Sequence, residues 1–290
     1  MNAPARRYEP GLPAVIDASH NYMIIIDLLG EGDLKTSWTT ARCAADQAAG
    51  IGATTYSRYV KIFNRPMLDA LLADIAERAS ESNVPLIAFD AHGSPDRGLL
   101  IAPTDTYAPW TEVKAALQRI NERTRNGTGV IMSSCYGMAV CSGIDITQPA
   151  PFQFCIAPKN EITAECVETK MRLFVSTMFE TQSMDRAVQH LQPDYDYWHS
   201  NEYFYSQFIG FLQKNTRGRG KQRFVEELTS KLLLAQAGDR NAVKMARQMA
   251  KNGTKDFEKH FVRLSNVFLH GRNHLSFKQI DEYAEKWPVY

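Results

Sequence analysis

A histidine and a cysteine each follow a run of apolar residues and each has a glycine close behind it. The stretch LIAFDAHGSPDRGLL, residues 86–100, runs from apolar residues to His92 and Gly93. The stretch GVIMSSCYG, residues 129–137, runs in the same way to Cys135, with a glycine two positions later. A thiolate is a strong nucleophile, and an imidazole beside it can accept its proton or stabilise its charge. The two residue types therefore indicate nucleophilic catalysis, provided that the fold brings the side chains together.

Strands and helices alternate along the first two thirds of the chain. Apolar and β-branched runs predict five strands, and amphipathic or Ala-rich segments between them predict helices. The expected strands lie at residues 22–29, 54–63, 84–93, 130–135 and 151–158. The expected helices lie at residues 34–53, 65–82, 110–124 and 162–182, with a short hairpin at 97–109. This order predicts an α/β fold, a three-layer α/β/α sandwich around a mostly parallel sheet.

From about residue 183 onwards the spacing is helical, and we expect no strand there. Residues 1–199 are therefore predicted to form the α/β domain, and residues 200–290 a helical C-terminal extension or subdomain. The aromatic run YDYWHSNEYFYSQFIGFL contains no Lys or Arg between its rings. We expect it to pack between the extension and the α/β domain rather than to stack on nucleic-acid bases.

The predicted fold places the two motifs near each other. Catalytic groups in open parallel sheets gather beyond the carboxyl ends of the strands. One hairpin and one helix separate His92 from Cys135, the smallest connection that returns the second strand parallel to the first. Neighbouring strands lie about 4.8 Å apart, so side chains at adjacent carboxyl ends can meet. Asp90 shares a strand face with His92 by simple alternation and can orient the imidazole.

The glycine after the histidine can contribute its backbone N–H to catalysis. Without a Cβ, the backbone N–H of Gly93 can approach a substrate closely. Together with the N–H of Cys135 it can hold the oxyanion of a tetrahedral intermediate.

The two stretches together resemble the active-site motifs of the caspase-like cysteine peptidases. This clan includes legumains, gingipains, separases, metacaspases and the bacterial CHAT-type proteases. The resemblance covers residues 20 to about 180 and leaves out the helical extension. It implies a caspase-like fold, with His92 as acid/base, Cys135 as nucleophile, and the N–H groups of Gly93 and Cys135 as the oxyanion site. In this clan the dyad often has no third catalytic acid, and we expect no cofactor.

The segments that form the substrate pocket in this clan differ here from those of caspases. The loop after the first strand, GEGDLKTS, is acidic where caspases carry an arginine, and position 133 is a serine where they carry a glutamine. Cleavage after aspartate is therefore not expected. The pocket candidates are Asp27, Glu31, Asp33, Ser133 and Glu161. Their acids favour a basic P1 side chain slightly, against the charge of Lys159 in the same region.

The composition argues against several other classes of protein. Lys and Arg total 33 against 32 Asp and Glu in 290 residues, and a net charge of +1 gives no basis for binding nucleic acid or an anionic membrane. No segment has the length of a signal peptide's apolar region or a membrane span, so we expect a soluble cytoplasmic protein. Five cysteines without a Cys-x-x-Cys pair fit neither a disulfide framework nor a zinc site. His270 and His274 have the spacing of helical metal ligands, but no third ligand accompanies them, so no metal is expected.

Two functional classes stay open. The first is a cysteine endopeptidase acting on a protein or peptide substrate, latent until a partner that contacts the helical extension activates it. The second is a catalytically silent caspase-like adaptor that uses the extension as its docking surface. A Gly-rich stretch at residues 215–224 carries Arg217 and Arg219, and is either a solvated loop between helices or a self-cleavage site. A nucleotide-binding domain is disfavoured because no Gly-rich phosphate loop follows the first strand.

Overall fold

The computed structural model describes residues 20–215, 218–235, 248 and 256–286. These residues divide into two compact units. The sheet unit contains the described residues up to Asp145 together with Ala150–Glu202. The helical unit contains Ile146–Pro149 together with the described residues from Tyr203 onwards. All strands that the described residues form lie in the sheet unit.

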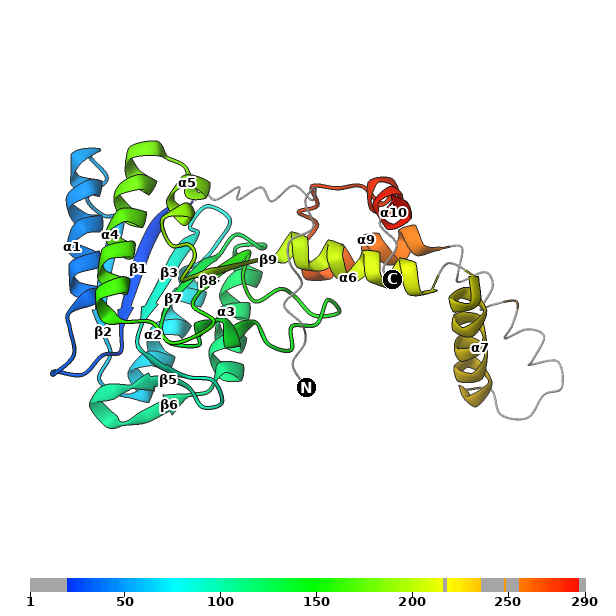
Figure 1. Ribbon diagram of the computed structural model, residues 1–290, viewed down its shortest axis with the longest axis horizontal. Helices are drawn as coiled ribbons and strands as arrows, with labels where there is room; N and C mark the ends of the chain where they lie inside the picture. Colours follow the sequence, from blue (N-terminus) through cyan, green and yellow to red (C-terminus); the bar gives the residue numbers. More distant parts are fainter. Residues whose placement is uncertain (1–19, 216–217, 236–247, 249–255, 287–290) are drawn as a thin grey trace. The chain divides into compact units, whose positions relative to one another are not determined.

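A six-stranded sheet with the strand order β2-β1-β3-β7-β8-β9 is the centre of the sheet unit (Figure 1). Its strands are β1 (Tyr22–Asp27), β2 (Ser57–Lys61), β3 (Pro85–Asp90), β7 (Gly129–Ser133), β8 (Phe154–Ala157) and β9 (Asp196–His199). The first five are parallel, whereas β9 is antiparallel to β8. Every residue of β3 is buried, as expected for a strand covered on both faces. The predicted mostly parallel sheet is therefore confirmed.

The sixth strand, β9, contradicts our expectation of no strand after residue 183. It has only four residues, DYWH, and three of them are only partly buried. Its pairing with β8 is antiparallel, from Phe154 opposite His199 to Ala157 opposite Asp196. A strand this short shows no clear alternation, and its aromatic residues continue into a helical pattern.

Three helices connect the parallel strands, and two more follow the last of these strands. They are α1 (Thr36–Gly50), α2 (Arg65–Arg78), α3 (Trp110–Arg123), α4 (Ala164–Thr181) and α5 (Met184–Gln189). The start of α2 is capped by Asn64, whose side chain accepts a hydrogen bond from the N–H of Met67. The side chain of Thr163 caps α4 in the same way through the N–H of Cys166. Helix α1 packs against α4, and α2 packs against α3.

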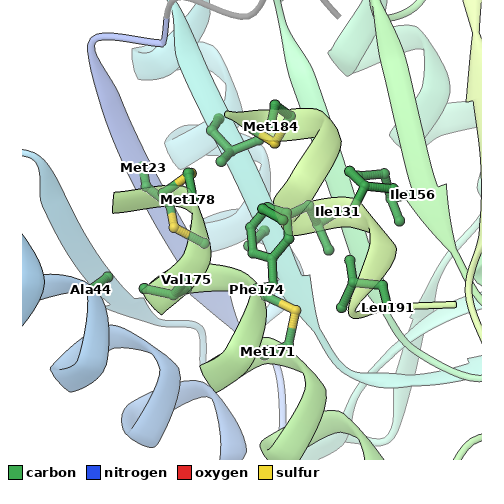
Figure 2. Close-up of a cluster of buried hydrophobic side chains, with 14 of the residues drawn as sticks. Met23, Ala44, Ile131, Ile156, Met171, Phe174, Val175, Met178, Met184 and Leu191 are labelled. Carbon is green, nitrogen blue, oxygen red and sulfur yellow. The ribbon is translucent and has the colours of Figure 1, made fainter. Parts of the chain in front are cut away.

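Apolar side chains from β1, β3, β7, β8, α1, α4 and α5 form one continuous cluster. Figure 2 shows Phe174 of α4 among side chains of the sheet and of the neighbouring helices. Ile131 of β7 and Ile156 of β8 belong to the same cluster and have no exposed surface. Burial of these apolar side chains away from water is the main favourable contribution to the free energy that holds β7 against the helices. It fixes the cysteine motif together with β7.

A second, antiparallel sheet lies between β3 and α3 in the chain. Its strands are β4 (His92–Ser94), β5 (Gly98–Ile101) and β6 (Thr106–Ala108), in that order. The hairpin predicted from the sequence is confirmed as β5 and β6. Gly98 has a φ of 110°, and a Cβ there would lie 2.0 Å from the carbonyl oxygen of Ala108, so this position requires glycine.

The helical unit consists mainly of helices with aromatic side chains between them. Helix α6 (Ser200–Asn215) begins in the sheet unit, and α7 (Gly218–Ala235), α9 (Phe257–Phe268) and α10 (Phe277–Lys286) follow. The rings of Phe204 and Phe208 contact each other, and both contact Phe261. The hydroxyl of Tyr205 accepts hydrogen bonds from the N–H groups of His274 and Leu275. In the described part of the chain, no helix combines the length and the apolar character needed to cross a membrane.

Candidate active site

The strands that precede the histidine and the cysteine are parallel neighbours, as predicted. Asp90 at the end of β3 lies opposite Ser133 at the end of β7. Beyond them, the N–H of Ala91 donates to the carbonyl oxygen of Ser133 at 3.3 Å. His92 and Cys135 follow at this same carboxyl edge of the sheet.

The position of His92 differs from the prediction in one respect. The sequence predicted His92 as the end of the third strand, whereas β3 ends at Asp90 and His92 begins β4 of the small sheet. Ala91 separates the two strands. The alternation that would place Asp90 and His92 on one face therefore does not apply.

The backbones of the two motifs touch at Gly93. A Cβ at this position would lie 1.9 Å from the carbonyl oxygen of Cys135 and 3.4 Å from the Cβ of Ser134. The first of these distances is far shorter than any non-bonded contact, and the atom involved is backbone. Glycine is therefore the residue that lets the histidine motif approach the cysteine motif this closely.

The imidazole of His92 contacts a carboxylate from another loop. Its Nε2 lies 3.1 Å from Oδ1 of Asp33, and the imidazole is 54% exposed. Oδ2 of Asp33 accepts the N–H of Gly30 at 2.6 Å. Burial alone would raise the pKa of Asp33, but the hydrogen bonds from Gly30 and His92 and the charges of His92 and Lys61 outweigh it and lower the pKa. Asp33, predicted as a pocket residue, is thus an ionised partner of His92.

Asp90 was predicted to orient His92, but it has a different hydrogen-bond partner. Only 7% of the residue is exposed, and its Oδ2 accepts the hydroxyl of Thr36 at 2.5 Å. Burial raises the pKa of Asp90 to about 7, with a further increase from the charge of Asp27 and an opposing effect of the Thr36 bond. The place beside the imidazole nitrogen belongs to Asp33.

The sulfur of Cys135 lies against the loop between β8 and α4. The N–H of Ile162 donates to Sγ at 3.4 Å, and Sγ lies 3.7 Å from the carbonyl oxygen of the same residue. Tyr136, the next residue, has a φ of 57°, which is uncommon for a residue with a large side chain. Its hydroxyl donates to Glu161 at 3.1 Å, and this bond raises the pKa of the phenol. Glu161, a predicted pocket residue, therefore lies on the cysteine side of the site.

The other acidic pocket candidates line a hollow of 540 Å³ beside β1. Its lining consists of Asp27, Leu29, Gly30, Glu31, Asp33, Leu34, Lys35, Trp38, Tyr59 and Lys61. The carboxylate of Asp27 is already engaged by neighbouring side chains. It accepts hydrogen bonds from the Tyr59 hydroxyl at 2.5 Å and from Lys61 at 3.0 Å. Burial and the bond to Asp27 raise the pKa of Tyr59. Glu31 is exposed on the rim of this hollow.

The remaining candidates are not brought together with the dyad. Ser133 is buried, and its Oγ accepts the Tyr195 hydroxyl at 3.2 Å, so it faces the interior. Lys159 forms an ion pair with Asp196 at 2.7 Å. Arg217 lies outside the described residues. Arg219 lies in α7, so the expected loop is helical from Gly218 onwards; self-cleavage there stays a prediction.

The five cysteines are all free thiols, and their surroundings differ. Cys155 is fully buried, which raises its pKa well above the ordinary value, with a smaller contribution from Cys141. Burial also raises the pKa of Cys166, and the charge of Asp194 adds to it. Cys135 and Cys43 are partly buried.

Within the described ranges there is no group of three or more side chains arranged to hold a metal ion. His270 and His274 lie in the loop between α9 and α10 rather than on a helix.

Two contacts of the site were not predicted from the sequence. The contact between Asp33 and His92 had an indirect signal, because the loop that carries Asp33 follows β1, and β1 pairs with β3. Two loops at the carboxyl ends of adjacent strands can touch. The contact between Cys135 and Ile162 uses the backbone of Ile162, so the residue type gives no signal.

No protein-family model matches this chain, and no curated protein matches it. The geometry at the carboxyl edge of β3 and β7 therefore carries the functional argument. It combines a thiol, an imidazole with a carboxylate partner, and a hollow next to that carboxylate. These groups are suited to nucleophilic attack on a carbonyl carbon with proton transfer by the imidazole.

Proposed function

We propose that the chain is a caspase-like cysteine endopeptidase in which Cys135 is the nucleophile and His92 the acid/base. One observation carries the proposal: the backbone of Gly93 lies directly on that of Cys135, which brings the two motifs to one place. The mostly parallel sheet and the pairing of α1 with α4 and of α2 with α3 support a three-layer α/β/α sandwich of this type. The helices from α6 onwards would form its C-terminal extension.

In the proposed reaction His92 takes the thiol proton, and Sγ of Cys135 attacks the carbonyl carbon of the scissile bond. The resulting oxyanion would be held by the N–H groups of Cys135 and Gly93. The Cys135 N–H makes no hydrogen bond to another described residue, so it is free to donate. His92 then gives its proton to the leaving amine as the C–N bond breaks. Water hydrolyses the thioester, with His92 again as the base.

The proposed substrate preference is a slight one for a basic P1 side chain. Glu31 at the hollow and Glu161 beside Cys135 are the acidic groups that support it. Lys159 counted against it in the sequence, but its ion pair with Asp196 compensates that charge. A positional-scanning peptide library measures this preference.

A latent state is part of the proposal. The sulfur of Cys135 is held by the backbone of Ile162, whose N–H lies at 3.4 Å and whose carbonyl oxygen lies at 3.7 Å. A substrate, or a partner that contacts the helical extension, would bring the thiol and the imidazole into a reacting pair. The same contacts of the sulfur favour the second candidate, a silent caspase-like adaptor in which they are permanent.

Thiol reactivity distinguishes the two candidates. In a peptidase, iodoacetamide or a peptidyl electrophile should alkylate Cys135 at least about tenfold faster than the other four cysteines, since an imidazole promotes the thiolate form. His92→Ala should remove most of that advantage. Peptide mapping by mass spectrometry after short labelling times measures each cysteine separately.

The matched control is His190→Ala, because His190 is exposed and follows α5, away from the dyad. This variant should label like the wild type. Equal labelling of Cys135 and the other accessible thiols, together with no cleavage of a mixed peptide library, would exclude the peptidase and leave the adaptor.

A further inference from the structure

We infer that Asp33 is a positioning residue that fixes the orientation and the proton of His92, and is not a residue of the substrate pocket. The inference rests on the proposed peptidase function. Its geometric basis is the 3.1 Å contact between Oδ1 of Asp33 and Nε2 of His92. The other oxygen of Asp33 is held by the N–H of Gly30 at 2.6 Å. Both carboxylate oxygens are thus engaged, which leaves Asp33 poorly suited to bind a substrate side chain.

The loop that carries Asp33 is fixed to the sheet at several points. Leu29 donates its N–H to Asp27 at 2.9 Å, and its carbonyl oxygen accepts Lys61 at 2.5 Å. The carbonyl oxygen of the preceding residue, Leu28, accepts the N–H of Ala102 at 2.9 Å. Asp33 is therefore presented from a well-anchored turn. A carboxylate held in this way can direct an imidazole ring.

The contact with a carboxylate determines which nitrogen of the His92 imidazole carries the hydrogen. A carboxylate only accepts hydrogen bonds, so Nε2 of His92 must carry a hydrogen when it faces Asp33. In the neutral ring the lone pair is then on Nδ1, which is the form that can take the proton of Cys135. Once that proton has been transferred, the negative charge of Asp33 stabilises the imidazolium.

Asp90 is the other carboxyl group near the histidine, and it lacks these properties. Its Oδ2 accepts the Thr36 hydroxyl, and the group is almost completely buried beneath the site. Burial raises its pKa to about 7, so it is partly protonated at neutral pH, whereas Asp33 is ionised.

The variant Asp33→Asn tests the inference sharply. The new amide oxygen should keep the N–H of Gly30, which turns the NH₂ group towards His92. An NH₂ donor requires an acceptor, so the hydrogen must leave Nε2 and the neutral ring must change to the Nδ1–H form. The rate of Cys135 alkylation and kcat for a cleaved peptide should fall about 10²-fold with little change in KM. Nitrogen-15 NMR of the imidazole should show the change of tautomer.

Two further variants serve as controls. Asp33→Glu keeps the carboxylate and should recover part of the rate. Asp105→Asn removes the same charge from another exposed loop, at a left-handed residue where asparagine is well tolerated, and should change neither rate nor tautomer. Thermal unfolding of each variant verifies that it is folded.

The outcomes separate this inference from the proposed function. If Cys135 of the wild type is not selectively reactive, the peptidase proposal fails, while the NMR comparison still tests the contact between Asp33 and His92. If the wild type is reactive and Asp33→Asn keeps both its rate and its tautomer, the positioning role is overturned alone. A rise in KM at constant kcat would also overturn it, because that result assigns Asp33 to the pocket.

Discussion

Gly93 is the residue where the two motifs meet, and the backbone there leaves no space for a side chain. Gly93→Ala would place a Cβ 1.9 Å from the carbonyl oxygen of Cys135, so β4 must move away from the cysteine. We expect a loss of more than about 2 kcal/mol in the free energy of unfolding, because the overlap is with backbone. Selective alkylation of Cys135 should disappear as well. Urea unfolding and labelling measure the two effects.

Gly50→Ala is the matched control for this substitution. A Cβ at Gly50 has no atom within 4 Å, and the residue lies at the end of α1. It should be neutral, or stabilising by a few tenths of a kcal/mol, because alanine favours the helix. Unchanged stability and labelling in Gly93→Ala would show that the close approach of the two motifs is not required.

Asp90 gives the protein a predictable pH dependence. Its pKa is about 7 in the folded state against the ordinary value of 3.8 in the unfolded chain. Between these two pH values the folded protein therefore binds more protons than the unfolded chain. The free energy of unfolding should therefore fall as the pH rises from about 4 to about 7, by at most about 4 kcal/mol, and level off above. Asp90→Asn should remove this contribution. It should match the wild type near pH 3, where Asp90 is protonated in both states, and be increasingly more stable towards pH 8 in urea unfolding experiments.

Comparing the two proteins at each pH cancels the titration of groups that they share. One such group is His20, whose pKa burial lowers to about 4. A parallel pH dependence in wild type and variant would contradict the assignment to Asp90.

At the residue scale, the sequence predicted that the two motifs lie on neighbouring parallel strands, but not how each side chain is oriented. The closeness of the motifs follows from a general rule for parallel strands, and it required only the strand assignments. Asp33 rather than Asp90 lies beside the imidazole, and this depends on the point where β3 stops. Because the chain leaves the large sheet after Asp90 and enters the small sheet at His92, alternation along one strand does not relate these two side chains.

At the scale of elements, a lysine of β2 connects this strand to the end of β1 and to the loop that carries Asp33. Lys61 of this edge strand bonds both the carboxylate of Asp27 and the carbonyl oxygen of Leu29. Lys61→Met should leave the buried charge of Asp27 without its partner and cost about 2–4 kcal/mol of unfolding free energy. Part of this loss should return in the double variant Lys61→Met with Asp27→Asn, since the charge is then absent. Urea unfolding of the wild type, the two single variants and the double variant gives the coupling.

A single Lys61→Met variant as stable as the wild type would show that the Asp27 carboxylate does not need this cation. The exposed pair between Lys159 and Asp196 is a suitable comparison, because exposed ion pairs contribute about 0–1 kcal/mol. Lys159→Met should therefore have a much smaller effect.

Elements with a strong pattern of their own were predicted well, and short ones were not. The apolar runs of β1, β3 and β7 and the amphipathic face of α2 determine those elements locally. By contrast, β4 has three residues and β9 has four, and each depends on the strand with which it pairs. A pattern of period two cannot be recognised in so few residues.

At the scale of the whole molecule, every described group of the candidate site belongs to the sheet unit. The chain passes into the helical unit between Glu202 and Tyr203, within α6. The predicted division at residues 199 and 200 was based on the loss of strand patterns, and it stays a prediction. The change from strand-like to helical spacing near residue 183 is nevertheless a physical signal. Apolar residues recur every second position in a strand and about every 3.6 positions in a helix.

The division of the strands into two sheets has a mechanical consequence. His92 is hydrogen-bonded into the hairpin sheet through β5, whereas the strand before Cys135 is part of the large sheet. One peptide linkage, at Ala91, joins the two hydrogen-bonded systems on the histidine side. The spacing between imidazole and sulfur therefore depends on the backbone angles at Ala91 as well as on the register of β3 and β7. We therefore expect a molecule that binds the hairpin of β5 and β6 to act on the imidazole through the pairing of His92 with Leu100.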